Sequence, residues 1–330
     1  MTKYKLLSTF HIINYLPNKI ELEYFDLTNL RGFRLLLKLI KLLNKINKHD
    51  IFLVSNAGSL IMLTCFFYKV ISRHRTMIVF WDTLLYRPRG MKSKILTMIK
   101  VILLKSVDWF YCNHRDTSGY EKYYKIPKNK FYYIPFKANN YYMLSEIEVG
   151  DKGYVLACGA SHRDYQTFIK AINVLEYPTK ILLPEKEIAA YHGSELSEEN
   201  IAENVEIIRH NFDSHSWNKY LANAKIVVIP IKKGALQSAG ISVYLEAMAL
   251  GKPVVITEGV STKGVLTNDM AVIVPAEDSE QLTLAIKKLW EDDEYRNRIS
   301  SNGKDYALSL GGAKRLVEDI LTALCYHFSI

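Results

Sequence analysis

Residues 226–257 read IVVIPIKKGALQSAGISVYLEAMALGKPVVIT, and this stretch decides the fold of the chain. Its two ends, residues 226–230 and 253–257, are short runs of β-branched apolar residues, which predict buried strands. Between them, residues 241–250 have the apolar spacing of a helix and carry one carboxylate, Glu246. A strand, a loop of small residues and a helix N-terminus form an anion site, because the backbone N–H groups and the helix dipole point to the same place. We therefore expect a phosphorylated ligand here.

Strand and helix patterns alternate on both sides of this stretch, which favours parallel sheets covered by helices. Strands are predicted at residues 5–8, 20–25, 51–55, 76–81, 108–112, 131–135, 154–158, 180–183, 205–209, 226–230, 253–257 and 271–275. Helices are predicted at residues 32–47, 59–72, 92–105, 117–125, 164–175, 217–223, 241–250, 279–291, 293–307 and 312–328. The polar and then acidic segment 139–152 is the predicted linker. The sequence thus predicts an α/β protein with two Rossmann-like domains, residues 1–145 and 146–330, whose parallel sheets face a cleft.

The charge of the chain is divided unevenly between these two halves. The whole sequence of 330 residues has a net charge of +9, and its 49% hydrophobic content is that of a folded protein. Residues 1–145 carry 24 Lys and Arg against 8 Asp and Glu, whereas residues 146–330 carry 19 against 26. Such a split suggests that the first half faces an anionic surface. No helix-turn-helix, zinc-finger or RNP-like pattern is present, so we expect an anionic membrane rather than nucleic acid.

Three stretches of the first half have the composition of a membrane-contacting surface. In residues 31–48, basic side chains recur at steps of three and four along a leucine-rich helix. Residues 92–105 repeat this theme, and residues 120–142 interleave nine aromatic rings with five lysines. A solvated basic face over ordinary core helices is the alternative. Residues 51–71 are apolar but interrupted by polar residues, which predicts a buried strand and helix rather than a membrane span.

The cysteines and the N-terminus indicate a cytoplasmic protein. The four cysteines are scattered without a Cys-x-x-Cys pair, and no signal peptide is recognisable. We expect a reduced protein that associates peripherally with the inner face of the cell membrane.

Several common sites are missing from the sequence. It contains no Gly-x-Gly-x-x-Gly, no Walker A loop, no His-Glu-x-x-His and no Gly-x-Ser-x-Gly. It also lacks the Asp-x-Asp metal clamp, and among the histidines only His210 and His215 have a spacing of interest. We therefore expect neither a cofactor nor a metal ion.

Two segments carry a resemblance to a known family. The run SAGISVYLEAMALGKPVVIT from Ser238, and the run CGASHRDYQTFIKA from Cys158, resemble the signature of family-4 retaining glycosyltransferases of the GT-B fold. The resemblance covers about residues 150–310. It implies sugar transfer from a nucleotide-diphosphate sugar to a lipid-linked or oligosaccharide acceptor, as in bacterial surface polysaccharide synthesis, without a metal. The last helix, residues 312–328, is then expected to cross back to the first domain.

The resemblance also assigns roles to individual residues. Glu246 occupies the position that binds the ribose hydroxyls of the donor nucleotide. The loop before the helix offers its backbone to the diphosphate and sugar; its residues are Ser238, Ala239, Gly240 and Ile241. Arg163 occupies the position of an arginine that pairs with the donor phosphates, and a guanidinium fork meets phosphate oxygens bidentately. With a lysine it would stabilise the charge that develops on the leaving phosphate.

Two departures from the family pattern leave alternatives open. The family's first glutamate, eight positions before Glu246, is Ser238 here, and the lysine that usually follows the arginine is missing. Lys232 or Lys233 is expected to replace that lysine. Asp82 ends a strand, where it serves either as an acceptor-site residue or catalytic base, or as an ordinary helix N-cap. The alternatives are an inverting transferase with Asp82 as base, a non-catalytic subunit that binds nucleotide sugars, and a nucleotide-sugar epimerase.

Overall fold

The computed structural model describes residues 4–10, 19–27, 33–72, 75–209 and 213–328. The chain forms two compact units, which are treated separately below. The N-terminal unit consists of Met1–Asn113, Thr117–Ile134 and Val317–Ile330, and the C-terminal unit of His114–Asp116 and Pro135–Leu316.

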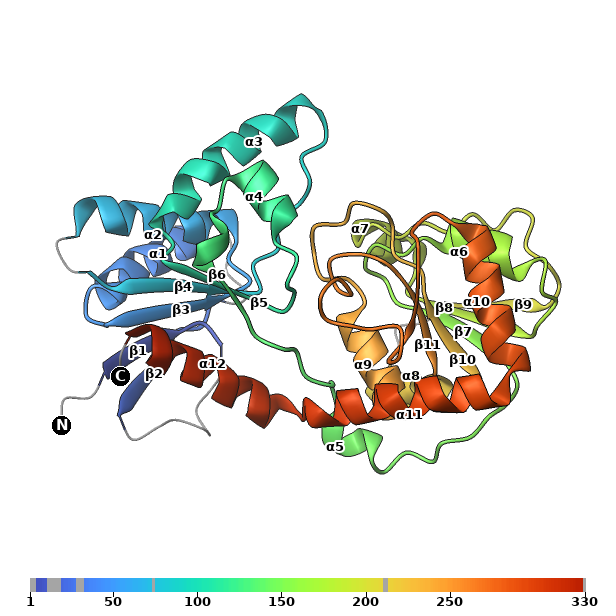
Figure 1. Cartoon of the computed structure of the whole chain (residues 1–330). Helices are drawn as coiled ribbons and strands as arrows, with labels where there is room; N and C mark the ends of the chain where they lie inside the picture. Colours follow the sequence, from blue (N-terminus) through green and yellow to red (C-terminus); the bar gives the residue numbers. More distant parts are fainter. Residues whose placement is uncertain (1–3, 11–18, 28–32, 73–74, 210–212, 329–330) are drawn as a thin grey trace. The chain divides into compact units, whose positions relative to one another are not determined.

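The N-terminal unit is built on a six-stranded sheet in the order β2-β1-β3-β4-β5-β6, drawn in blue to green in Figure 1. All pairs of neighbouring strands in this sheet are parallel. The strands are β1 (Tyr4–Ser8), β2 (Ile20–Tyr24), β3 (Ile51–Ser55), β4 (Met77–Trp81), β5 (Trp109–Cys112) and β6 (Phe131–Tyr133). The first half of the chain therefore has the predicted strands, displaced by at most two residues at their ends.

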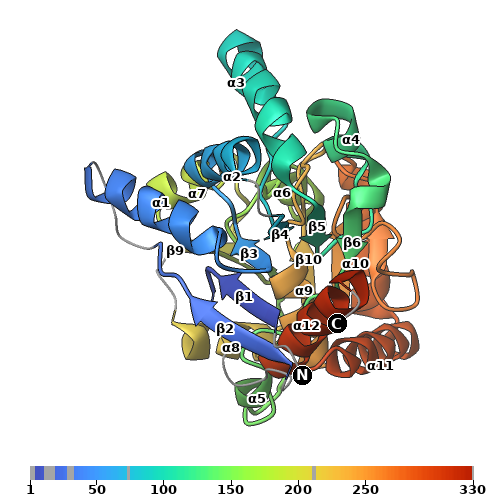
Figure 2. The same cartoon turned by 90° about the vertical axis from the view of Figure 1, so that its left-hand side faces the viewer.

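Helices connect these strands and pack in succession, α1 on α2, α2 on α3 and α3 on α4 (Figure 2). They are α1 (Phe33–Ile46), α2 (Ser59–Ile71), α3 (Gly90–Leu103) and α4 (Ser118–Tyr124), with short 3₁₀ turns η2 (Leu104–Ser106) and η3 (Lys128–Lys130). The apolar segment 51–71 forms the predicted strand and helix, β3 and α2, but the prediction that both are buried is wrong for α2, because five of its large apolar side chains are exposed. No helix within the described residues is long and apolar enough to cross a membrane.

The aromatic stretch 120–142 contributes to the interior more than the sequence suggested. Tyr120 and Tyr124 are 4% and 3% exposed, and their hydroxyls donate to the carbonyls of Thr83 and Tyr86. The prediction of a membrane-facing aromatic surface is therefore wrong for these rings, because the turn of α4 directs them inward against the loop that follows β4.

The C-terminal helix α12 (Ala313–Phe328) returns to the N-terminal unit, to which its residues from Val317 onward belong. The His327 ring stacks on Trp109 of β5 with ring centroids 3.7 Å apart. Its Nδ1 lies 2.8 Å from the hydroxyl oxygen of Tyr111 on the same strand. The end of α12 is thus anchored to β5.

The division between the units also differs from the predicted boundary after residue 145. Residues 135–145 belong to the C-terminal unit, because the short helix α5 (Tyr141–Leu144) packs on α9 (Ile241–Ala249). Leu144 is buried in the core around α9, and Tyr141 packs against it. The predicted linker therefore begins inside a packed element.

The C-terminal unit contains a second parallel sheet of six strands, in the order β12-β11-β10-β7-β8-β9. Its strands are β7 (Val155–Cys158), β8 (Thr179–Leu183), β9 (Val205–Arg209), β10 (Ile226–Ile229), β11 (Val254–Thr257) and β12 (Val272–Val274). Its other helices are α6 (Tyr165–Ile172), α7 (Lys186–Tyr191), α8 (Ser214–Asn223), α10 (Ser279–Glu291) and α11 (Asp293–Ser309). Every predicted strand of this half is present, and α7 is an addition to the prediction.

Both faces of this sheet are buried, and the alternation along its strands sorts side chains between two cores. On β10, Val227 and Ile229 join the core that contains α8 and α9. Ile226 and Val228 point to the opposite face and join the core that contains α6 and α10. This is why β10 reads as an unbroken apolar run in the sequence.

The strand order of the C-terminal unit fixes where a ligand can bind. Adjacent strands β7 and β10 lead to connections that run in opposite directions, from β7 toward β8 and from β10 toward β11. In open parallel sheets, ligands bind at such a switch point, beyond the carboxyl ends of the strands. The loops after β7 and β10 are therefore the expected site of binding.

Helix α11 packs closely on α9, and this packing can be tested at Gly303. A Cβ atom there would lie 2.9 Å from the Met270 carbonyl oxygen and 3.1 Å from Met248 Cγ. Gly303→Leu is expected to lower the free energy of unfolding by about 1 to 3 kcal/mol through overpacking. Ser301→Leu, at an exposed position of the same helix, is the control and should change it by no more than about 0.5 kcal/mol. Urea unfolding measures both, and equal effects would contradict the packing described.

Candidate functional site

The loops that follow β7 and β10 are joined by backbone hydrogen bonds at the switch point. The Asp164 N–H donates to the Pro230 carbonyl over 2.8 Å, and the Lys232 N–H donates to the His162 carbonyl over 2.8 Å. These two bonds form an antiparallel bridge between Arg163 and Ile231, just beyond the ends of the parallel strands β7 and β10. These hydrogen bonds hold the backbone segments of the predicted residues Arg163 and Lys232 close together in space.

The Arg163 side chain is buried between these loops, with 2% of its surface exposed. Its Nε donates to the Cys158 carbonyl over 2.9 Å, and its Nη1 donates to the Ser161 carbonyl over 2.7 Å. In the described part of the chain no carboxylate forms an ion pair with it. Burial lowers the pKa of this guanidinium. A buried cation without a counter-ion is costly, and a bound anion would compensate its charge.

Because Gly159 has no Cβ atom, it leaves room for the Arg163 side chain. Gly159 has φ = +110°, and a Cβ atom at this position would overlap Arg163 Nη2. The residue therefore has to be glycine for two reasons, the backbone conformation and the contact with the guanidinium.

The N-terminus of α9 faces the same loops and has no side-chain cap among the described residues. Its N-cap is Gly240, with φ = +88°, and a Cβ atom there would lie 3.0 Å from Ile229 Cγ2. The first N–H groups of a helix have no partner within the helix, so the first turn from Ile241 onward offers donors to an anion. The Ala239 N–H already donates to the Gln237 carbonyl over 2.8 Å.

The remaining predicted loop residues differ in exposure. Ser238 and Lys232 are half-buried, whereas Lys233 is exposed. Nearby, Gln237 is 7% exposed and its Oε1 lies 2.5 Å from His162 Nε2. The other amide atom, Gln237 Nε2, is buried and has no hydrogen-bond partner within the described structure. The loop thus presents an unsatisfied donor beside Ser238, which sequence reasoning did not identify.

Glu246 lies in the second turn of α9 and is 4% exposed. Its Oε2 accepts a hydrogen bond of 2.9 Å from the Trp217 indole N–H of α8. Burial raises the pKa of Glu246 to about 7, while hydrogen bonds from Trp217 and Asn139 and the nearby Lys137 ammonium oppose the rise. The carboxyl group is therefore held in place by groups from two separate segments, α8 and residues 137–139.

Sequence reasoning missed these partners of Glu246. Asn139 was placed in a linker, Lys137 in a membrane-facing stretch, and Trp217 only in a helix. A buried carboxylate requires donors, so their existence follows from the apolar setting of Glu246. Which residues supply these donors cannot be inferred from the sequence, because α8 and the segment before α5 approach α9 only through the tertiary fold.

Asp82 lies in the N-terminal unit, at the carboxyl end of β4, with φ = +49°. It caps no helix, because α3 begins at Gly90 with Arg89 as its N-cap, so the N-cap alternative is wrong. Burial raises the pKa of Asp82, and a hydrogen bond with Asn113 opposes the rise.

Unsatisfied polar atoms surround Asp82. Trp81 Nε1, Thr83 Oγ1 and Asn113 Oδ1 are all buried without a hydrogen-bond partner within the described structure. Trp81 and Thr83 flank Asp82 in the sequence, and Asn113 follows β5, the neighbour of β4. This cluster is suited to bind hydroxyl groups.

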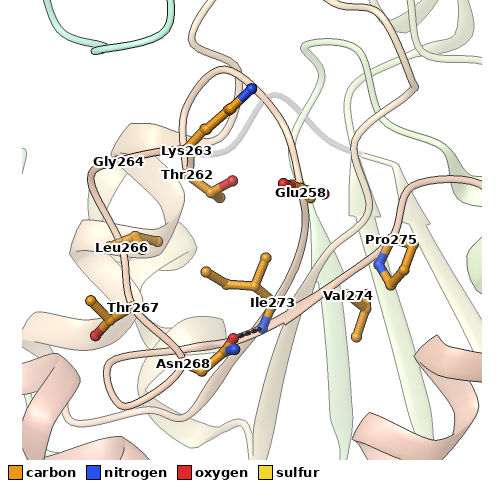
Figure 3. Close-up of a pocket in the computed structure, with 10 residues that line it drawn as sticks. All are labelled: Glu258, Thr262, Lys263, Gly264, Leu266, Thr267, Asn268, Ile273, Val274 and Pro275. Atoms are coloured by element: carbon orange, nitrogen blue, oxygen red, sulfur yellow. Dashed lines mark hydrogen bonds between the residues drawn. The ribbon is translucent and has the colours of Figure 1, made fainter.

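A cavity of about 420 Å³ lies elsewhere in the C-terminal unit, at the carboxyl ends of β11 and β12 (Figure 3). Glu258, Lys263, Asn268 and Ile273 are among its lining residues. None of the predicted site residues lines it. We place the candidate site at the switch point instead, because the buried cation and the helix N-terminus lie there.

Comparisons with known proteins agree with this fold. Residues 191–306 match the family model described as glycosyl transferases group 1. A solved glycosyltransferase from Rickettsia africae ESF-5 is 12% identical with a TM-score of 0.67, and the match covers 99% of each chain. The HepE protein of Anabaena, solved in complex with UDP-glucose, is 13% identical with a TM-score of 0.69, over 98% of this chain and 100% of that one.

A UDP-N-acetylglucosamine 2-epimerase is also similar, at 14% identity and a TM-score of 0.53, over 99% of this chain and 97% of that one. No curated protein matches the sequence. At these identities the solved structures show the fold alone, which is GT-B, with its two parallel sheets. The matched domain adds the class of protein, and the chain is a transferase enzyme of the glycosyltransferase type.

The raised pKa of Glu246 predicts a pH dependence of stability. A carboxyl group with a higher pKa in the folded than in the unfolded protein stabilises the fold below its unfolded value. The stabilisation relative to Glu246→Gln should be complete below about pH 4.5 and lost as the pH rises through about 7. The difference between the two proteins should change by about 3 kcal/mol at most over this range. Thermal melts of both proteins from pH 4.5 to 8 measure it, and parallel curves would contradict the shift.

Proposed function

We propose that the protein transfers a sugar from a nucleoside-diphosphate sugar, which binds at the switch point of the C-terminal unit. The observation that carries this proposal is the buried Arg163 guanidinium, which forms no ion pair with a carboxylate of the described residues. It lies on the loop after β7, and the uncapped N-terminus of α9 follows the adjoining loop after β10. A bound diphosphate would supply negative charge that balances both the guanidinium and the partial positive charge of the helix N-terminus. The unsatisfied Gln237 Nε2 gives a further donor to the same ligand.

Glu246 is proposed to accept hydrogen bonds from the ribose hydroxyls. Trp217 and Asn139 orient its carboxyl group, so that one side of it is fixed before the nucleotide arrives. The Anabaena HepE structure was solved with UDP-glucose, which supports a nucleotide-sugar donor for a chain of the same fold. Ser238 stands where the resembled family has a glutamate, and we propose that its hydroxyl contacts the donor sugar.

The leaving group of the proposed reaction is the nucleoside diphosphate, on which negative charge develops as the glycosidic bond breaks. Arg163, a lysine at position 232 or 233 and the first turn of α9 would stabilise this charge. Preorganised donors of this kind need no rearrangement during the reaction. The reacting carbon passes through an oxocarbenium-like state. We propose retention of configuration and no requirement for a metal ion, as the family resemblance implies.

The N-terminal unit is proposed to bind the acceptor, a lipid-linked saccharide of bacterial surface polysaccharide synthesis. The polar cluster around Asp82 supports a hydroxyl-bearing acceptor, and the basic first half of the sequence supports an anionic membrane as its location. The protein would then act at the inner face of the cell membrane. The epimerase alternative is kept because an epimerase shares the fold.

The donor site is tested with a panel of UDP-, GDP- and ADP-sugars in thermal-shift measurements. At least one should raise the melting temperature, and Glu246→Ala should weaken its binding. Gly159→Ala should weaken binding about tenfold or more, because it displaces the Arg163 guanidinium. The control is Gly153→Ala, where φ is also positive (+67°) but the added Cβ meets nothing within 4 Å. No response to any nucleotide sugar or nucleoside diphosphate would overturn the donor site.

The stereochemical course is tested by following the anomeric configuration of the product by NMR. Under the proposal the configuration of the donor is retained. An inverted product, together with a loss of about 10²–10⁴-fold in kcat for Asp82→Asn, would instead identify Asp82 as a general base. Epimerised nucleotide sugar formed without any acceptor would show the epimerase alternative to be correct.

A further inference from the structure

Helix α3 presents an apolar stripe to solvent. A surface helix normally turns such a stripe toward the core and its polar side chains outward. Here large apolar residues recur at steps of four, three and four along the exposed face. They are Met91, Ile95, Met98 and Ile102, which are 74%, 52%, 69% and 52% exposed. Only Thr97 and Leu103 of α3 are buried.

The neighbouring helix α2 has a stripe of the same kind. Its exposed residues are Leu60, Leu63, Phe67, Val70 and Ile71, which are 48%, 38%, 46%, 66% and 74% exposed. The two helices contact each other, and Figure 1 shows α3 extending upward beyond α2. These nine residues of α2 and α3 are called the α2–α3 surface below. Exposed apolar surface of this extent marks an interaction site.

The segment of sequence that carries the α2–α3 surface is strongly basic. Residues 51–107 contain nine Lys and Arg but a single acidic residue, Asp82, which lies at the carboxyl end of β4. Arg87, Arg89, Lys92 and Lys94 are exposed at the start of α3 and just before it. Among the described residues, the ion pair that this segment forms is Lys69–Asp108. The partner of the surface must therefore be apolar and negatively charged.

The basic helix α1 is a weaker candidate for the same contact. Two of its lysines, Lys38 and Lys45, pair with Asp26 and Glu23. Its residues before Leu37 lie outside the part whose side chains are described. In the aromatic stretch 120–142, Tyr120 and Tyr124 are buried. The α2–α3 surface is therefore the best supported of the stretches with a membrane-like composition.

An anionic bilayer fits this surface better than a second copy of the chain. A symmetric contact between two such faces would bring unpaired lysines and arginines of both copies together, and like charges oppose association. A bilayer offers hydrocarbon to the apolar stripes and phosphate groups to the basic side chains at their edge.

We propose that the α2–α3 surface is inserted into the headgroup and upper acyl region of an anionic membrane. The stripes of α2 and α3 enter the apolar layer, and Arg87, Arg89, Lys92 and Lys94 contact lipid phosphates. This inference rests on the membrane association proposed above and assigns it to specific side chains. Because apolar burial does not depend on ionic strength, binding should retain a component that resists salt.

The test is sedimentation of the full chain with vesicles of phosphatidylglycerol and phosphatidylcholine. Wild-type protein is expected to bind the anionic vesicles, with partial release at high salt. The double variant Ile95→Glu/Met98→Glu should bind at least about tenfold more weakly, because two apolar side chains are lost from the lipid phase and two charges are added. The control is Val174→Glu/Leu284→Glu in the C-terminal unit, where the two side chains are 70% and 58% exposed. It adds the same charge and should bind nearly as well as wild type.

Each outcome decides the proposal. Equal loss in both double variants, or no loss in either, would overturn the assignment to α2 and α3 while leaving membrane association itself in place. Wild-type protein that does not bind anionic vesicles would overturn both the assignment to α2 and α3 and the membrane association. A wild-type dimer in light scattering that Ile95→Glu/Met98→Glu dissociates would assign the surface to a second copy instead. Thermal shifts with nucleotide sugars on the same preparations report folding and the donor site independently.

Discussion

The pairing of β7 with β10 is the interaction on which the candidate site depends. Their parallel register, Ile226 beside Val155 and Val228 beside Ala157, brings together two strands separated by about a third of the C-terminal unit. Because an antiparallel bridge between Arg163 and Ile231 follows the strand ends, the two loops are held against each other. Arg163 and the Gly240 N-cap of α9 are consequently carried by loops at the same end of the sheet.

The loop after β7 also explains why the buried guanidinium of Arg163 can be tolerated. Carbonyl oxygens of Cys158 and Ser161 take up part of its hydrogen-bonding capacity, and Gly159 leaves room beside it. Carbonyl dipoles lower the cost of burying the charge but do not neutralise it. Under the proposed function, a bound diphosphate would balance the remaining charge and would be released after each turnover, while the loop holds the guanidinium in place.

Sequence patterns predicted most of the fold because it is built from short, strongly apolar strands and periodic helices. β10 and α9 were predicted almost to the residue, since both are buried on all sides and leave unbroken apolar runs. The donors to Glu246 could not be predicted, because they come from α8 and from residues 137–139, which approach α9 only in three dimensions. Residues 92–105, in α3, were among the stretches predicted to contact a membrane, but the exposed stripe of α2 was missed, because residues 51–71 were predicted to be buried. Apolar periodicity shows that a helix has an apolar face, but not whether the rest of the fold covers it.

The anchoring of α12 on β5 has a consequence for how the chain folds during synthesis. Trp109 and Tyr111 leave the ribosome about two hundred residues before His327, their partner on α12. The segments of the C-terminal unit are synthesised between these two halves of one core. The N-terminal unit therefore begins to fold first but is completed last, because Trp109 and Tyr111 on β5 lack their contact with His327 until translation reaches α12.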